Sequence, residues 1–187
     1  MSARIVALVG SLRAGSTNRQ LAEAAVGIAP EGVTVELFEG LAEVPFYNED
    51  IDVESSLPEA AARLRAAVSD AAGLLLVVPE YNGTMPAVLK NAIDWLSRPY
   101  GSGAIKDKPV AVIGTAFGQY GGEWAQTEAR KAAGVAGGVV VEDVKLAIPG
   151  SLTRFADTHP SEDAEVITGL SAVLASLAAA ATAPAKA

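Results

Sequence analysis

A run of small, hydroxylated and basic residues at positions 10–18, G-S-L-R-A-G-S-T-N, follows the first apolar stretch of the chain. Proteins hold phosphate with hydroxyls, guanidinium groups and the free backbone N–H groups of a helix N-terminus. The segment offers all three, because a helix is expected to begin at Asn18, whose side chain could cap it. The side chains that could contact a phosphate are Ser11, Arg13, Ser16, Thr17 and Asn18. The alternative is an ordinary strand-to-helix turn.

Two common nucleotide motifs can be excluded at this segment. Gly10 and Gly15 have the spacing of the glycines in a P-loop, but Ser16 stands where that motif requires a lysine. Leu12 occupies the position of the second glycine in the dinucleotide signature G-x-G-x-x-G. The segment is therefore expected to bind a monophosphate rather than a triphosphate or a dinucleotide.

Two later segments also combine glycine with polar residues: 79–86, P-E-Y-N-G-T-M-P, and 114–122, G-T-A-F-G-Q-Y-G-G. In the earlier one, the Tyr81 ring could lie against a flat ring system. The alternative there is that Tyr81 packs locally and that Glu80 is a solvated acid. In the later one, the glycines and the Thr115 hydroxyl suit close approach of a ligand to the backbone. A flexible loop without a ligand is the alternative.

Short apolar runs alternate with stretches of helical periodicity, which indicates an α/β fold. The runs L-L-L-V-V and V-A-V-I-G are continuously apolar, as in strands buried on both faces of a parallel sheet. Strands are expected at 5–9, 33–38, 74–78, 110–113 and 139–146, and helices at 18–28, 58–70, 86–97, 120–133 and 161–180. These elements predict a flavodoxin-like doubly wound sheet of five parallel strands in the order 2-1-3-4-5. Ligands of such sheets bind at the carboxyl ends of the strands, where the three polar segments would then lie.

The helix expected at 86–97 carries Leu89, Ile93 and Leu96 at core spacing, with Trp95 elsewhere on its surface. A helix with one apolar face would leave this tryptophan exposed, so we expect a partner subunit to cover it. The alternative is that Trp95 lies in the core of its own subunit.

Composition limits the size and the partners of the protein. The 187 residues, half of them hydrophobic, suit one domain spanning 1–187, with a frayed tail near 181–187. The net charge of −8 disfavours nucleic acid as a partner. We expect no membrane contact, because no apolar stretch is expected to reach the roughly 18 residues that cross a bilayer. The lack of cysteine and of a signal-like N-terminus predicts a cytoplasmic protein.

Several kinds of catalytic site are disfavoured. Without cysteine there is no thiolate metal site and no cysteine nucleophile. The single histidine, His159, is expected in a C-terminal connection away from the polar segments, so neither a metal site nor a Ser-His-Asp triad is expected. If the protein is an enzyme, a cofactor should supply its difficult chemistry.

The polar segments together resemble those of the NADPH-dependent FMN reductase family, flavodoxin-like oxidoreductases that include quinone, chromate and azo-dye reductases. Residues 10–18 match the phosphate loop of that family, and residues 79–98, P-E-Y-N-G-T-M-P-A-V-L-K-N-A-I-D-W-L-S-R, resemble its signature. Residues 45–50, P-F-Y-N-E-D, resemble its loop before the second helix. The resemblance covers roughly residues 5–144.

The resemblance implies a site for FMN and a homodimer or homotetramer. The implied contacts are Ser11, Arg13, Ser16, Thr17 and Asn18 at the phosphate, Pro79, Glu80, Tyr81, Asn82 and Gly83 along the ribityl chain and isoalloxazine, and Thr115 and Gly118 on the third side. Gln119 departs from the family, whose members often carry a basic residue there. The choice between NADPH and NADH and the contacts of a tetramer therefore stay open.

The implied activity is hydride transfer from NADPH or NADH through bound FMN to a small-molecule acceptor such as a quinone or free flavin, in two half-reactions that share one pocket. No side chain is expected to act as acid or base. One rival is a flavodoxin-type electron carrier without NAD(P)H turnover, which the acidic charge would suit. Another is a flavin-free binding or interaction module on the same fold.

Overall fold

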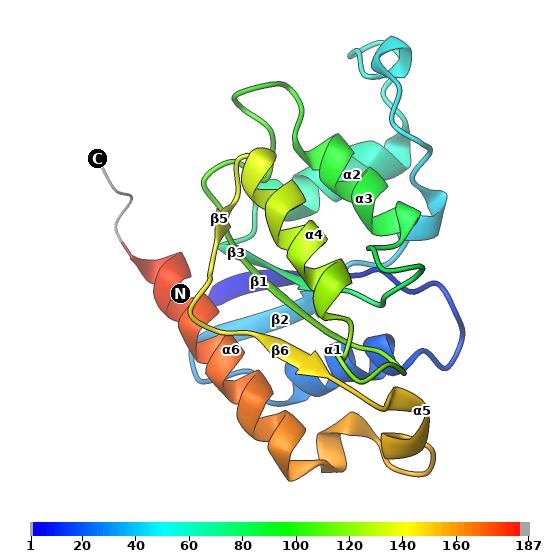
Figure 1. Ribbon diagram of the computed structural model, residues 1–187. Helices are drawn as coiled ribbons and strands as arrows, with labels where there is room; N and C mark the ends of the chain where they lie inside the picture. Colours follow the sequence, from blue (N-terminus) through cyan, green and yellow to red (C-terminus); the bar gives the residue numbers. More distant parts are fainter. Residues whose placement is uncertain (1, 184–187) are drawn as a thin grey trace.

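The computed structural model describes residues 2–183, which form a parallel sheet with helices on both faces (Figure 1). The longer strands are β1 (Ala3–Val9), β2 (Val33–Leu37), β3 (Gly73–Val77) and β4 (Pro109–Thr115). Their order is β2-β1-β3-β4, so the direction in which strands are added reverses between β1 and β3. The predicted flavodoxin-like α/β fold is confirmed, and its switch point is the place where such folds bind ligands.

The central strands bury side chains on both faces. In β1, Val6 and Leu8 belong to one core, whereas Ile5, Ala7 and Val9 belong to the other. Helices α2 (Glu59–Ser69), α3 (Ala87–Leu96) and α4 (Glu123–Val135) cover the first core, as Figure 1 shows. Helices α1 (Thr17–Gly27) and α6 (Ala164–Thr182) cover the second. The continuous apolar runs of the sequence therefore come from burial on both faces of a parallel sheet.

The main helices begin and end within three residues of the predicted positions. They are α1 (Thr17–Gly27), α2 (Glu59–Ser69), α3 (Ala87–Leu96), α4 (Glu123–Val135) and α6 (Ala164–Thr182). The sequence did not predict the short α5 (Ser151–Arg154) or the 3₁₀ turns Leu41–Glu43, Glu49–Ile51 and Pro160–Glu162. These short elements lie in connections, where local patterns are weakest.

The prediction of a single fifth strand at 139–146 is wrong. Two short strands, β5 (Val139–Val140) and β6 (Leu146–Ile148), both pair in parallel with β4. Val110 pairs with Val140, but Ile113 pairs with Leu146, so residues 141–145 lie opposite only two residues of β4. This segment bulges out of the sheet. The run V-V-V-E-D-V-K-L also has β-branched residues between the two strands, Val141 and Val144, so its pattern does not mark the interruption.

Trp95 is fully buried within its own subunit, so the prediction that a partner covers it is wrong. Its indole Nε1–H donates to the carbonyl of Pro45 at 2.8 Å, and its ring packs edge-on against Tyr47 at 5.0 Å between centroids. The Arg65 guanidinium lies over the Trp95 ring, 5.1 Å from its centroid. The connection that follows β2 therefore folds over α3, and its residues Pro45 and Tyr47 cover the tryptophan.

Helix α6 is long and apolar enough, by length and composition, to cross a membrane. The expectation that no apolar stretch is long enough to cross a bilayer is therefore wrong by length and composition, because the many alanines of α6 count as apolar. Its larger side chains nevertheless pack in the second core: Val166, Leu170, Val173, Leu174 and Leu177. α6 is thus a core helix of this sheet. Residues 181 and 182 belong to α6, and residues 184–187 of the tail expected to fray lie outside the described residues.

Candidate functional site

Three polar loops meet at the carboxyl ends of β1, β3 and β4: the first loop (residues 10–16), the second loop (78–86) and the third loop (116–122). The Gly10 N–H donates to the carbonyl of Val77 at 2.9 Å, which holds the first loop to the end of β3. The buried Asn18 side chain joins α1 to the end of β4: its Oδ1 accepts from the Thr115 N–H at 3.0 Å, and its Nδ2 donates to the Thr115 carbonyl at 2.9 Å. Asn18 therefore fixes the spacing between the first and third loops.

The first loop leaves its backbone donors free. Ser16, rather than Asn18, caps α1, because the Ser16 Oγ accepts from the Arg19 N–H at 3.3 Å. Among residues 2–183, no hydrogen bond takes up the backbone N–H groups of residues 11–15, Thr17 or Asn18. Gly15 has a φ of 67°, a left-handed conformation that favours glycine and turns the chain into the helix. Free N–H groups at the positive end of a helix dipole form an anion site.

The side chains around these N–H groups are also available to a ligand. Arg13 is exposed, and its one hydrogen bond to the described part of the chain is a long contact of 3.4 Å to the carbonyl of Ala14. Ser11 and Thr17 are half-buried at the edge of the same cluster. The Ser16 hydroxyl accepts from Arg19, so it can still donate its own proton. Of the five side chains predicted here, Asn18 is the one already engaged on both of its amide atoms.

The second loop contains a tight two-residue turn. Tyr81 and Thr84 exchange backbone hydrogen bonds of 3.0 and 3.1 Å, and the turn residues Asn82 and Gly83 have φ values of 52° and 76°. Positive φ at both central residues favours the sequence Asn-Gly, which is the sequence found here. Pro79 is buried beside Gly10, where a Cβ would lie 3.1 Å from the proline ring. The turn thus presents the exposed Tyr81 from a rigid backbone.

Glu80 ties the second loop to α4. Its Oε2 accepts from the Ala125 N–H at 3.2 Å, within the first turn of α4, whose own N-cap is Gly122. A carboxylate at this position satisfies a free donor and interacts favourably with the helix dipole. The alternative of a solvated acid is therefore wrong for Glu80, whose side chain positions the second loop against the third.

The third loop lies directly on β6. The Thr115 Oγ1 donates to the Ile148 carbonyl at 2.8 Å, and the Ala116 N–H donates to the same carbonyl at 3.2 Å. A Cβ on Gly121 would lie 2.6 Å from the backbone of β6, so only glycine allows this approach. A Cβ on Gly118 would meet nothing within 4 Å, so space is open there for a ligand. The third loop is therefore held at its base and open at its tip.

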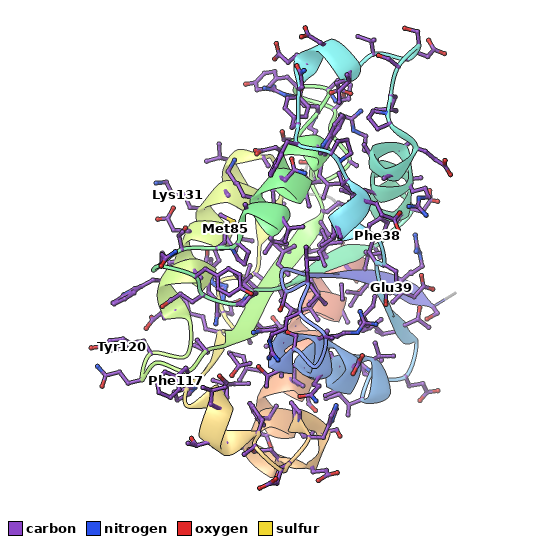
Figure 2. The ribbon with its side chains drawn as sticks, turned by 90° about the vertical axis from the view of Figure 1, so that its right-hand side faces the viewer. Phe38, Glu39, Met85, Phe117, Tyr120 and Lys131 are labelled. Carbon is purple, nitrogen blue, oxygen red and sulfur yellow. The ribbon has the colours of Figure 1, made fainter. Side chains whose placement is uncertain are left out.

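Exposed aromatic side chains border the loops, and the sequence analysis missed most of them. Phe117, Tyr120 and Trp124 are 69%, 53% and 57% exposed. The rings of Tyr120 and Trp124 lie 5.5 Å apart between centroids and are tilted by 36°. Figure 2 shows Phe117 and Tyr120 projecting outward from the third loop. Their clustering in a glycine-rich segment was a usable signal, because short glycine-rich loops seldom bury several large rings.

Other ionisable clusters lie away from these loops. The Arg65 guanidinium holds the pKa of Asp52 below its usual range, and Arg154 lowers the pKa of Asp163 to about 2. As expected for a loop residue, His159 caps a 3₁₀ turn, where its Nδ1 accepts from the Ser161 N–H at 3.2 Å. Within residues 2–183, no cluster of three or more acidic or histidine side chains could hold a metal ion. A groove of about 650 Å³ lies between α3 and α4, and Met85 is the one residue of the three loops that lines it.

The loops can together hold an elongated ligand with an anionic end and a flat end. The anion would lie against the free N–H groups at the start of α1, and the flat part would lie between the second and third loops. No acid/base side chain is needed for this arrangement, which fits a ligand that carries its own chemistry.

The comparisons with known proteins agree with this geometry. A family model described as NADPH-dependent FMN reductase matches residues 3–153, which include all three loops. The 2-hydroxy-1,4-benzoquinone reductase of a Burkholderia species is 45% identical over 130 residues, covering 70% of this chain and 69% of the relative. The NAD(P)H-dependent FMN reductase PA1204 of Pseudomonas aeruginosa is 39% identical over 128 residues, 68% of each chain.

A solved structure adds a likeness over nearly the whole chain. FerB, a flavoenzyme NAD(P)H:(acceptor) oxidoreductase from Paracoccus denitrificans, superposes with a TM-score of 0.78 at 27% identity, covering 95% of this chain and 98% of that one. With the family match spanning the three loops, the chain belongs to the NADPH-dependent FMN reductase family.

Proposed function

We propose that this protein is an FMN-dependent oxidoreductase that takes hydride from NADPH or NADH and delivers it to a quinone, with free flavin as a further acceptor. Membership of the family supports an NAD(P)H-dependent oxidoreductase activity that uses FMN. The observation that carries the proposal is the set of free backbone N–H groups at the start of α1, among the described residues, beside two loops with exposed rings. The relatives named quinone and benzoquinone reductases support the acceptor class.

The first loop fits a phosphate monoester. Its free N–H groups, the exposed Arg13 guanidinium and the hydroxyls of Ser11, Ser16 and Thr17 would donate to the phosphate oxygens. Asn18 would contribute differently from its predicted role. Its amide is engaged with Thr115, so we propose that it keeps the phosphate loop at a fixed distance from the third loop.

The other two loops would hold the flat end of the cofactor. Pro79, Asn82 and Gly83 would offer backbone groups, and Tyr81 would offer a ring face, while Glu80 keeps the turn against α4. Thr115 and Gly118 would border the third side. A bound flavin supplies the hydride-accepting and hydride-donating chemistry. The chain's own part would be to orient the rings and to exclude water from the buried side.

The exposed aromatic rim would receive the nicotinamide donor and the acceptor in turn. Phe117, Tyr120 and Trp124 offer large apolar surfaces suited to flat, uncharged molecules such as quinones. An exposed rim of this size also supports the homodimer or homotetramer implied by the family resemblance. We propose a single domain that acts in the cytoplasm, and sedimentation analysis of the purified protein tests its assembly.

The decisive experiment is an absorbance spectrum of protein reconstituted with FMN, followed by addition of NADPH and then of 1,4-benzoquinone. We expect flavin bands, their loss with NADPH under anaerobic conditions, and continuous NADPH oxidation with the quinone. Bound flavin without NADPH or NADH oxidation would overturn the reductase assignment in favour of an electron carrier. Failure to take up FMN would favour a flavin-free binding module.

A further inference from the structure

Arg130 is a buried cation that the proposed chemistry does not use. It lies on α4 and is 7% exposed. Its Nη2 donates to the carbonyl of Val112 at 2.7 Å, whereas its Nη1 has no hydrogen-bond partner among the described residues. Burial lowers the pKa of the guanidinium, and the carboxylate of Glu142 acts in the opposite direction. A charged group is expensive to bury, so its position calls for a structural reason.

The reason is the break in the edge of the sheet. The Val141 N–H donates to the Val110 carbonyl at 2.9 Å, so the next carbonyl of β4 on this side belongs to Val112. A continuous strand would satisfy Val112 with the N–H of residue 143, but residues 142–145 bulge away before β6 begins at Leu146. The Arg130 side chain enters from α4 and supplies the missing donor. It therefore replaces a ladder hydrogen bond at the point where the register of the sheet changes.

Beyond the break, β6 is the base on which the third loop rests. The Ile148 carbonyl accepts from both Thr115 Oγ1 and the Ala116 N–H, and the Ser151 N–H donates to the Ala116 carbonyl at 3.1 Å. One helical turn before Arg130, the buried Gln126 donates from Nε2 to the Leu146 carbonyl at 3.2 Å. Two side chains on one face of α4 thus bond to the two strands that meet beyond the break, Arg130 to β4 and Gln126 to β6.

We propose that Arg130 is a positioning residue that holds β6 in its shifted register and thereby sets the third loop in place for the cofactor. This rests on the proposed function, because it takes the third loop as one side of the FMN site. Only three paired residues of β6 hold it to β4, and a strand of that length is weak without side-chain support. Without the guanidinium, the Val112 carbonyl would be buried without a donor, and β6 would loosen.

The test compares Arg130→Met and Arg130→Lys with Lys108→Met. Methionine fills similar apolar volume without a donor, and lysine retains one. Lys108 is a matched control, because its ammonium also donates to backbone carbonyls, those of Ser69 and Ala71, but at the opposite end of the sheet. Amide hydrogen exchange of the FMN-free protein and FMN affinity by fluorescence quenching are measured for each.

For Arg130→Met we expect about tenfold faster exchange of the amides of residues 146–151, with about tenfold weaker FMN binding. Arg130→Lys should recover most of both losses, and Lys108→Met should change neither of these readouts. Unchanged exchange at β6, or equal losses in the lysine and methionine variants, would overturn the inference. If the native protein does not bind FMN, the proposed function fails, while the exchange data still decide whether Arg130 holds β6.

Discussion

The first loop and the segment 44–52, whose residues 45–50 resemble a loop of the reductase family, treat their polar groups in opposite ways. The first loop leaves a row of backbone N–H groups and the Arg13 guanidinium without firm partners. In the segment 44–52, the Pro45 carbonyl accepts from both Asn91 and Trp95, and Asp52 is held by two hydrogen bonds of 2.6 and 2.7 Å from Arg65. Free backbone and side-chain donors suit the first loop to a ligand site. The hydrogen bonds of the segment 44–52 instead stabilise the fold around that site.

The largest expected effect comes from removing a side chain that packs against the segment 44–52. Trp95→Ala should lower the free energy of unfolding by about 3–5 kcal/mol, because it removes a fully buried indole and one of the two donors to the Pro45 carbonyl. Urea unfolding of the FMN-free protein measures this. Trp124, the other tryptophan, is 57% exposed, so Trp124→Ala should cost less than about 1 kcal/mol. Similar losses of unfolding free energy in Trp95→Ala and Trp124→Ala would contradict the difference in burial between the two tryptophans.

The second prediction concerns the first loop, where Arg13 is exposed. Arg13→Ala should weaken FMN binding about tenfold and leave the unfolding free energy of the FMN-free protein nearly unchanged, because the exposed guanidinium has one long contact within the described chain. Titration of flavin fluorescence gives the affinity. Arg63→Ala, which removes an exposed arginine paired with Glu43 elsewhere, is the control and should bind FMN normally. Unchanged affinity in Arg13→Ala would remove this side chain from the phosphate site.

The smallest effect is one of pH. Because Arg65 lowers the pKa of Asp52, the ion pair stabilises the folded state fully above the ordinary carboxyl pKa, near 4, and this contribution is lost as the pH falls through the lower folded value. Between about pH 4 and pH 2, the native protein should lose about 1 kcal/mol more than Asp52→Asn. Unfolding of the FMN-free protein at each pH measures the difference; parallel curves for the two proteins would contradict it.

The sequence predicted most of what depends on local pattern. The continuous apolar run L-L-L-V-V identified a central strand, and the run of hydroxyls and glycines in the first loop stays a prediction of a phosphate site. What it missed depends on partners distant in the chain. Trp95 is buried because the connection after β2 folds back over α3, and Glu80 caps a helix that begins more than 40 residues later.

The broken fifth strand shows the same limit more sharply. Its residues favour a strand on both sides of the bulge, and the register change is accompanied by a side chain on α4 that no local window contains. At the candidate site, one role differs from the sequence prediction. Asn18 was expected to cap α1, but Ser16 caps it, and the Asn18 amide is engaged by the backbone of Thr115.

That amide has a consequence for protein engineering. Asn18 and Thr115 are 97 positions apart in the chain, yet they act as one structural unit. The Asn18 side chain hydrogen-bonds to both the N–H and the carbonyl of Thr115. The first loop and the start of α1, transplanted into another doubly wound protein, would carry Asn18 but not the strand end that receives it. The transferable unit is therefore the loop together with the last residue of β4, and a graft of either alone would leave a buried amide without its partner.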